Sequence, residues 1–121
     1  MVYTAESRSL AALEVLANLE GPARGYSLVA CEIAETLVET LAPGALPDDW
    51  RAAPAPPGLA ALGDAWVARA SSVALAVPSA VVEGERNYLL NPTHRDFRRV
   101  KIHPPEAFPY DERLVVLTER R

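Results

Sequence analysis

The sequence predicts a single mixed α+β domain whose sheet is mostly antiparallel and flanked by helices. Three observations support this prediction. The 121 residues suit one compact domain, half of them are hydrophobic, and segments with helical apolar spacing are interspersed with short runs rich in β-branched residues. We expect the domain to span residues 1–121 and some of its strands to pair out of sequence order.

The first predicted element is a helix over residues 4–20, because leucines recur there three positions apart and fall on one face. Thr4 or Ser7 can cap its start by accepting a hydrogen bond from a free backbone N–H. Gly21 and Pro22 end it, since neither residue supports a continuing helix.

Residues 26–33 are rich in Val, Ile and Tyr, which predicts a strand. Residues 34–41 fit either a short helix or a continuing strand and turn. From residue 43 to residue 58 the chain holds five prolines and two glycines. This composition predicts an irregular surface loop inside the domain.

A second helix is predicted over residues 59–70. Residues 72–82 contain two strand-like runs broken at Pro78-Ser79, because a proline cannot donate to a sheet ladder. Residues 86–91 are a further strand candidate.

Asn91-Pro92-Thr93 then forms a turn that can start a short helix, with Thr93 as its cap. Residues 99–103 and 113–118 complete the predicted strands.

The net charge of −4 is unevenly spread, since residues 1–50 carry a net −6 and residues 51–121 a net +2. This distribution argues against general nucleic-acid binding and allows a local anion site in the second half. No apolar run approaches the roughly 20 residues of a membrane span, and no signal peptide is recognisable, so we expect a cytoplasmic protein. One cysteine and two histidines make no standard structural zinc site, so we expect no metal.

No motif of a known enzyme class stands out by spacing alone, so the candidates are polar residues in apolar settings. Glu14 is either a solvated glutamate or a partly buried carboxylate that stabilises positive charge in a transition state. Ser79 is either a turn serine that bonds its own backbone or a hydroxyl held at a strand end, facing a pocket. Tyr3 is either a core or interface residue or a ring that stacks on a base.

Two single residues and one basic segment are further polar features of the sequence, and each has a structural explanation beside any functional one. His94 is either a helix-start residue in a local hydrogen-bond network or a catalyst. Cys31 is predicted as a small core residue in a strand. The basic run over residues 95–101 is either a solvated face or a phosphate site.

The ordered pattern VYTAES, ALEV, GDAW, VPSAVV and NYLLNP resembles the RES domain, the toxin half of RES–Xre toxin–antitoxin systems. The family takes its name from an arginine, a glutamate and a serine, and the resemblance places the last two on Glu14 and Ser79. It places a family tyrosine on Tyr3. The arginine lies upstream of the tyrosine segment, and no residue here falls on it. We therefore expect the family's N-terminal segment to be absent, through a true start upstream of Met1, a truncated inactive chain, or a fragment.

The resemblance implies a fold similar to ADP-ribosyltransferases and degradation of NAD by cleavage of the nicotinamide–ribose bond, as a glycohydrolase or a phosphorylase. Glu14 would then stabilise the charge on the ribose, Ser79 would fix the ribose or the carboxamide, and Tyr3 would stack on a ring. Two alternatives stay open: a truncated, non-catalytic module that binds an Xre-type antitoxin, and a protein ADP-ribosyltransferase. An Xre-type helix-turn-helix antitoxin is the expected protein partner, and a homodimer is left open.

Overall fold

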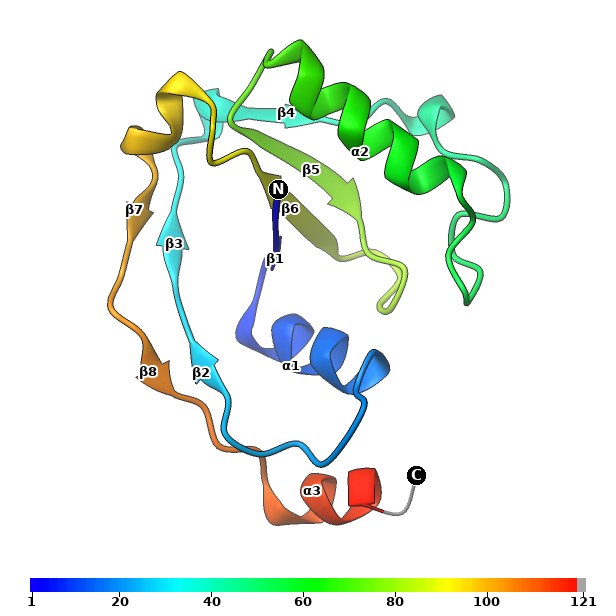
Figure 1. Cartoon of the computed structure of the whole chain (residues 1–121), viewed down its shortest axis with the longest axis vertical. Helices are drawn as coiled ribbons and strands as arrows, with labels where there is room; N and C mark the ends of the chain where they lie inside the picture. Colours follow the sequence, from blue (N-terminus) through cyan, green and yellow to red (C-terminus); the bar gives the residue numbers. More distant parts are fainter. Residues whose placement is uncertain (120–121) are drawn as a thin grey trace.

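A four-stranded sheet forms the centre of the fold (Figure 1), and the computed structural model describes residues 1–119 of the chain. The strand order is β1-β6-β5-β4. The four strands are β1 (Val2–Ala5), β6 (Arg86–Leu90), β5 (Ala74–Pro78) and β4 (Val38–Thr40). Among the strands described over residues 1–119, only the β4–β5 pair is parallel. The predicted α+β class, with a mixed, mostly antiparallel sheet and pairing out of sequence order, is confirmed.

Both faces of this sheet are covered, which explains the continuous apolar run in β5. On one face, Leu75 and Leu89 are cross-strand partners that pack against Trp66 of α2 (Gly58–Arg69). On the other face, Ala74 and Leu90 pack in a second cluster with residues that precede β5 and follow β6. Side chains alternate between the two faces along each strand. The predicted helix over residues 59–70 is therefore confirmed almost to the residue.

Helix α1 (Arg8–Ala17) follows β1 after a two-residue bend. Ser7 caps the helix, since its Oγ accepts a hydrogen bond from the Leu10 N–H at 3.0 Å. Of the two predicted caps, Ser7 is right, whereas Thr4 lies in β1. The helix predicted over residues 4–20 is too long at its start, because residues 2–5 pair with β6 instead.

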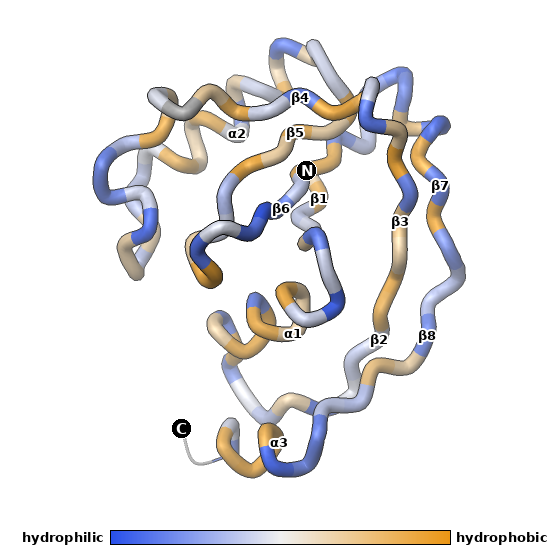
Figure 2. The backbone as a smooth tube through the Cα atoms, turned by 180° about the vertical axis from the view of Figure 1, so that it is seen from behind, coloured by the Kyte–Doolittle hydropathy of each residue, from blue (hydrophilic) through white to orange (hydrophobic). Residues whose placement is uncertain are grey.

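Two short antiparallel ladders follow one another end to end along one side of the molecule, apart from the central sheet (Figure 2). In one, β2 (Ser27–Leu28) pairs with β8 (Glu106–Ala107), and in the other β3 (Cys31–Glu32) pairs with β7 (Lys101–Ile102). The strand predicted over residues 26–33 is thus two short strands. Cys31 lies in a strand as predicted, but it is exposed, so its prediction as a core residue is wrong.

Three short 3-10 helices connect these elements: η1 (Glu35–Leu37), η2 (Pro43–Ala45) and η3 (Arg95–Arg99). Residues 34–41 hold both a short helix and a strand, η1 followed by β4. His94, not the predicted Thr93, caps η3, because its Nδ1 accepts a hydrogen bond from the Asp96 N–H at 3.0 Å. Residues 79–82, the second half of a predicted strand region, form no strand and bend at residues 80–82, so only β5 remains there.

The strand predicted over residues 113–118 is wrong, because this segment is helix α3 (Glu112–Glu119). Asp111 starts the helix, since its Oδ1 accepts a hydrogen bond from the Arg113 N–H at 2.9 Å. The buried residues Val115 and Thr118 are three positions apart, the spacing of one helical face. None of the helices described over residues 1–119 is long and apolar enough to cross a membrane.

Candidate active site

Glu14 and Ser79 lie in contact although they are 65 positions apart in the sequence. The Ser79 hydroxyl donates a hydrogen bond to Glu14 Oε1, with 3.1 Å between the two oxygens. Glu14 comes from α1, and Ser79 comes directly after β5. The chain therefore brings together the two residues that the family resemblance singled out.

The Ser79 side chain is fixed from several directions and is only 1% exposed. Its Oγ accepts hydrogen bonds from the N–H groups of Val81 and Val82, both at 3.1 Å. Its own N–H donates to the Glu85 carbonyl at 2.8 Å, which closes the turn after β5. Gly84 has φ +89° in this turn, a left-handed conformation that favours glycine. Ser79 is thus both a turn serine and a partner of Glu14.

Glu14 lies on the wall of a cavity of about 560 Å³ between α1 and the β1–β6 edge of the sheet. The Glu14 side chain is half-buried, so it is not a fully solvated glutamate of the helix flank. Tyr3 and Asn87 line the same cavity. Glu14, Tyr3 and the buried residue Asn87 therefore line one hollow beside the Ser79 hydroxyl.

The electrostatics of the site are visible at Tyr3. Partial burial and then the negative charge of Glu14 raise the pKa of the Tyr3 phenol from 10.0 to about 12. The phenol therefore keeps its proton at neutral pH and can donate a hydrogen bond. Tyr3 is also 57% exposed, so part of its ring is available to a ligand.

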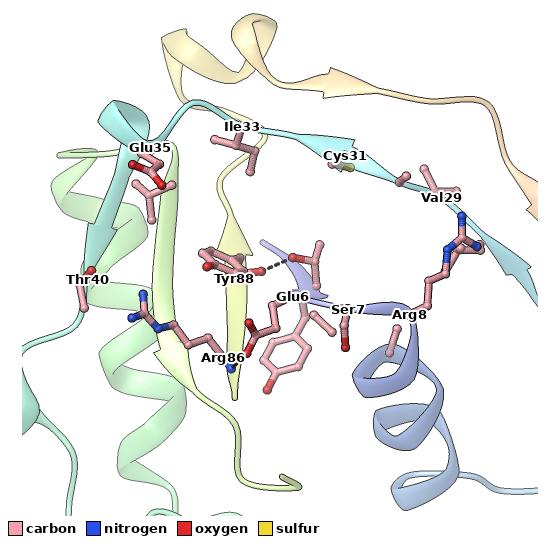
Figure 3. A pocket seen from close by; sticks show the side chains of 17 residues that line it. Glu6, Ser7, Arg8, Val29, Cys31, Ile33, Glu35, Thr40, Arg86 and Tyr88 are labelled. Atoms are coloured by element: carbon pink, nitrogen blue, oxygen red, sulfur yellow. Dashed lines mark hydrogen bonds between the residues drawn. The ribbon is translucent and has the colours of Figure 1, made fainter. Parts of the chain in front are cut away.

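A second cavity, of about 660 Å³, lies on the opposite side of β1 and shares Tyr3 and Thr4 in its lining (Figure 3). Tyr88 and Arg86 project into it from β6, and the Arg86 side chain extends toward Thr40. The Arg86 guanidinium has no ion-pair partner among the described residues. Its backbone N–H donates to Glu6 Oε1 at 2.6 Å.

The basic run over residues 95–101 lies outside both cavities. Arg99 pairs with Asp96 at 3.9 Å and Lys101 pairs with Glu32 at 3.5 Å, on exposed surface. These contacts favour the solvated-face interpretation of the run over a phosphate site.

His94 has a structural role. Its Nε2 lies 3.0 Å from the Ala70 carbonyl, to which it can only donate, while its Nδ1 accepts from the Asp96 N–H. The imidazole therefore ties the end of α2 to the start of η3. The helix-start interpretation of His94 is confirmed.

Sequence reasoning missed Asn87 and Arg86, which the structure places in the walls of the two cavities. The one sequence feature that could have indicated them is that these two polar residues stand next to the apolar end of the segment Arg86 to Leu90. Strand periodicity alone puts these two side chains on opposite faces, but it does not show that a cavity adjoins each face. Within residues 1–119, no group of three or more His, Cys, Asp or Glu side chains is placed to hold a metal ion.

Comparison with known proteins shows the family of this chain. The RES domain matches residues 1–111. The chain is 36% identical over 116 residues to Toxin Res of Yersinia enterocolitica serotype O:8, covering 93% of this chain and 76% of that protein. It is 35% identical over 121 residues to the Prs ADP-ribosylating toxin of Sphingobium sp. (strain YBL2), covering 95% and 74%.

Toxin Res of Photorhabdus laumondii is 35% identical over 117 residues, covering 94% of this chain and 75% of that protein. The match to the domain spans most of the chain, and each of the three relatives is identical to it at about a third of the aligned residues. Since Glu14 and Ser79 also meet in the fold, sequence and geometry lead to one conclusion: this chain belongs to the RES domain family.

Proposed function

We propose that this chain is a toxin that degrades NAD by cleaving the bond between nicotinamide and ribose. The observation that carries the proposal is the contact between Glu14 and Ser79 on the wall of the 560 Å³ cavity. The name of the Sphingobium relative supports it, because an ADP-ribosylating toxin must break the same bond before it transfers ADP-ribose.

The reaction has a simple electron balance. The bond between ribose C1′ and the pyridinium nitrogen breaks, and its electron pair leaves with nicotinamide, whose ring becomes neutral. The ribose then carries a positive charge shared between C1′ and its ring oxygen. A carboxylate close to this charge lowers the energy of the transition state, and Glu14 is the carboxylate in the cavity.

The other residues position the reacting groups. The hydrogen bond from Ser79 holds the Glu14 carboxylate in one orientation, so less reorganisation is needed as the ribose charge develops. Tyr3, with its raised pKa, offers a protonated phenol and an exposed ring face to the same cavity. Addition of water at C1′ releases a proton and gives ADP-ribose, whereas addition of phosphate gives its 1-phosphate.

The decisive experiment is nicotinamide release from NAD by the chain, measured with and without phosphate. We expect turnover, and phosphate dependence would identify a phosphorylase. Glu14→Gln keeps the shape of the side chain and a hydrogen-bond acceptor for Ser79, but it removes the charge. We expect it to lower kcat by about 100-fold or more, the scale of losing one electrostatic group at a transition state.

Asp64→Asn is the matched control, because Asp64 is an exposed carboxylate on α2 that lines neither cavity. It should leave the rate unchanged. If Glu14→Gln releases nicotinamide as fast as the unmodified chain, the proposed role of Glu14 is wrong.

Protein ADP-ribosylation is the second candidate, and it is favoured by the name of the Sphingobium relative. In that case the acceptor at C1′ is a side chain of a target protein. A cell extract incubated with this chain and NAD would then contain a protein heavier by one ADP-ribose. As the matched relatives are named toxins, we propose that a neutralising antitoxin binds this chain in the cytoplasm, with an Xre-type helix-turn-helix protein as the candidate.

A further inference from the structure

Asn87 carries a buried carbonyl oxygen that accepts no hydrogen bond. The residue is 0% exposed, and its Nδ2 donates to the Thr4 carbonyl at 3.2 Å. Its Oδ1 is the one buried side-chain polar atom without a partner in the part of the chain that the structure describes. Buried polar atoms are nearly always paired, so an orphaned acceptor of this kind calls for an explanation.

The position of Asn87 in the sheet places it beside the reacting groups. Its cross-strand partners are Ala5 of β1 and Val77 of β5. Ser79 follows Val77 by two residues, just beyond the end of β5, so Asn87 lies beside the strand end that leads to Ser79. Asn87 lines the cavity that Glu14 and Tyr3 also line. A ligand in that cavity therefore lies against the strand segment that carries Asn87, whose side chain is itself buried.

The neighbouring polar groups leave Asn87 as a free, uncharged acceptor. Ser79 already donates to Glu14 and accepts from two backbone N–H groups. Glu14 is an anion and suits the positive ribose. The Asn87 Oδ1 carries no net charge, so it suits an uncharged N–H donor, and the Nδ2 bond to Thr4 fixes which way the amide points.

We propose that the Asn87 Oδ1 accepts a hydrogen bond from the carboxamide N–H of the nicotinamide ring, and that Asn87 thereby selects a primary amide on the leaving group. This inference rests on the proposed NAD cleavage. Nicotinamide is bonded to the ribose carbon at which Glu14 acts, so its carboxamide lies within the same cavity. An amide N–H that donates to the Asn87 Oδ1 gives this buried oxygen its missing hydrogen bond. A ligand without such a donor leaves the oxygen unpaired, which costs binding free energy.

The test compares NAD with its 3-acetylpyridine analogue, in which a methyl ketone replaces the carboxamide and no N–H remains. Asn87→Ala and Asn87→Leu remove the acceptor, and the leucine variant retains the branched shape of the side chain. We expect each variant to lose about tenfold in kcat/KM for NAD, the scale of one neutral hydrogen bond, and to change less than about twofold for the analogue. Equal losses with the two substrates would overturn the proposal.

Asn91→Ala is the matched control. Asn91 is a second buried asparagine just beyond β6, but its Oδ1 is fully paired, to the Thr93 N–H at 3.1 Å and the Thr93 hydroxyl at 2.7 Å. Its loss should lower thermal stability and leave the ratio of the two substrates unchanged, and a changed ratio would contradict the assignment to Asn87.

The two proposals fail in different ways. An unmodified chain that neither binds nor cleaves NAD refutes the proposed function, and the role of Asn87 with it. An unmodified chain that cleaves NAD while the Asn87 variants keep their substrate ratio refutes the Asn87 proposal alone.

Discussion

One carboxylate sets the electrostatics of the candidate site. Glu14 accepts a hydrogen bond from the Ser79 hydroxyl, and its negative charge also affects Tyr3. The pKa of the Tyr3 phenol is raised to about 12, mainly by burial and secondly by the Glu14 charge. Both effects favour the neutral phenol. Tyr3 therefore serves as a hydrogen-bond donor throughout the physiological pH range and cannot serve as a base there.

This coupling between Glu14 and Tyr3 predicts how the pKa of the Tyr3 phenol changes when Glu14 is replaced. In a titration of phenolate absorbance, the difference between the chain and Tyr3→Phe should show a group with a midpoint at about 12. Glu14→Gln should lower this midpoint but leave it above 10.0, because burial is the larger cause and stays in place. A midpoint for Tyr3 that does not respond to Glu14→Gln would show that the two groups are not coupled.

At the level of residues, the sequence supports only part of the site. Tyr3, Glu14 and Ser79 were found through family resemblance, and the contact between Glu14 and Ser79 depends on a fold that no local pattern reveals. Asn87 and Arg86 were missed because both lie in an ordinary strand segment. Their importance comes from the cavities on either face of β6, which are tertiary features.

Among the secondary-structure elements, α2 ends at a strained residue. Ala70 is the C-cap with φ 50° and ψ 33°, in the left-handed region that glycine adopts without cost. Its N–H bonds the carbonyls of Trp66 and Val67, and its own carbonyl accepts from His94. The contacts of the helix end with η3 thus hold an alanine in a conformation that it does not favour by itself.

Ala70→Gly should therefore stabilise the protein by about 0.5–1 kcal/mol, because relief of the left-handed strain exceeds the added freedom of glycine in the unfolded chain. Denaturant unfolding measures this difference. Ala68→Gly is the control in the same helix, where glycine should cost about 1 kcal/mol. A loss of stability in both variants would show that the Ala70 conformation carries no strain.

Predictions of helices and strands were right where the local sequence pattern and the packing in the fold favour the same structure. Helix α2 has its predicted apolar residue Trp66 buried against the sheet, and strand β6 is paired on both sides. Strand β1 was missed because its partner lies 84 positions away, and the helical pattern that follows it extends back over its residues. Helix α3 was missed because its Leu-Val-Val run has strand propensity, which the capping at Asp111 and packing of Val115 override.

Across the whole molecule, α3 closes the fold onto the segment that follows α1. The buried Thr118 Oγ1 accepts a hydrogen bond from the Ala23 N–H at 3.2 Å and donates to the Val115 carbonyl at 2.6 Å. Arg24 bridges Glu112 and Glu119 at the surface, at 2.8 and 3.2 Å. Exposed ion pairs contribute little, so the buried Thr118 contact is the stronger connection.

Thr118→Val should lower the free energy of unfolding by about 1–3 kcal/mol, because the buried Ala23 N–H loses its acceptor. Thr118→Ser retains the hydroxyl and should lose much less. Equal destabilisation by the two variants would assign the effect to the missing methyl group and not to the hydrogen bond.

The pairing of β1 with β6 also orders events in time. A ribosome makes a chain from its N-terminal end, so Tyr3 and Glu14 leave it long before Ser79 and Asn87 do. Until β6 has emerged, β1 has no partner in the sheet, and neither wall of the 560 Å³ cavity is complete. A nascent chain that has not yet released residues 86–90 from the ribosome therefore has no assembled site, and any activity waits for that release.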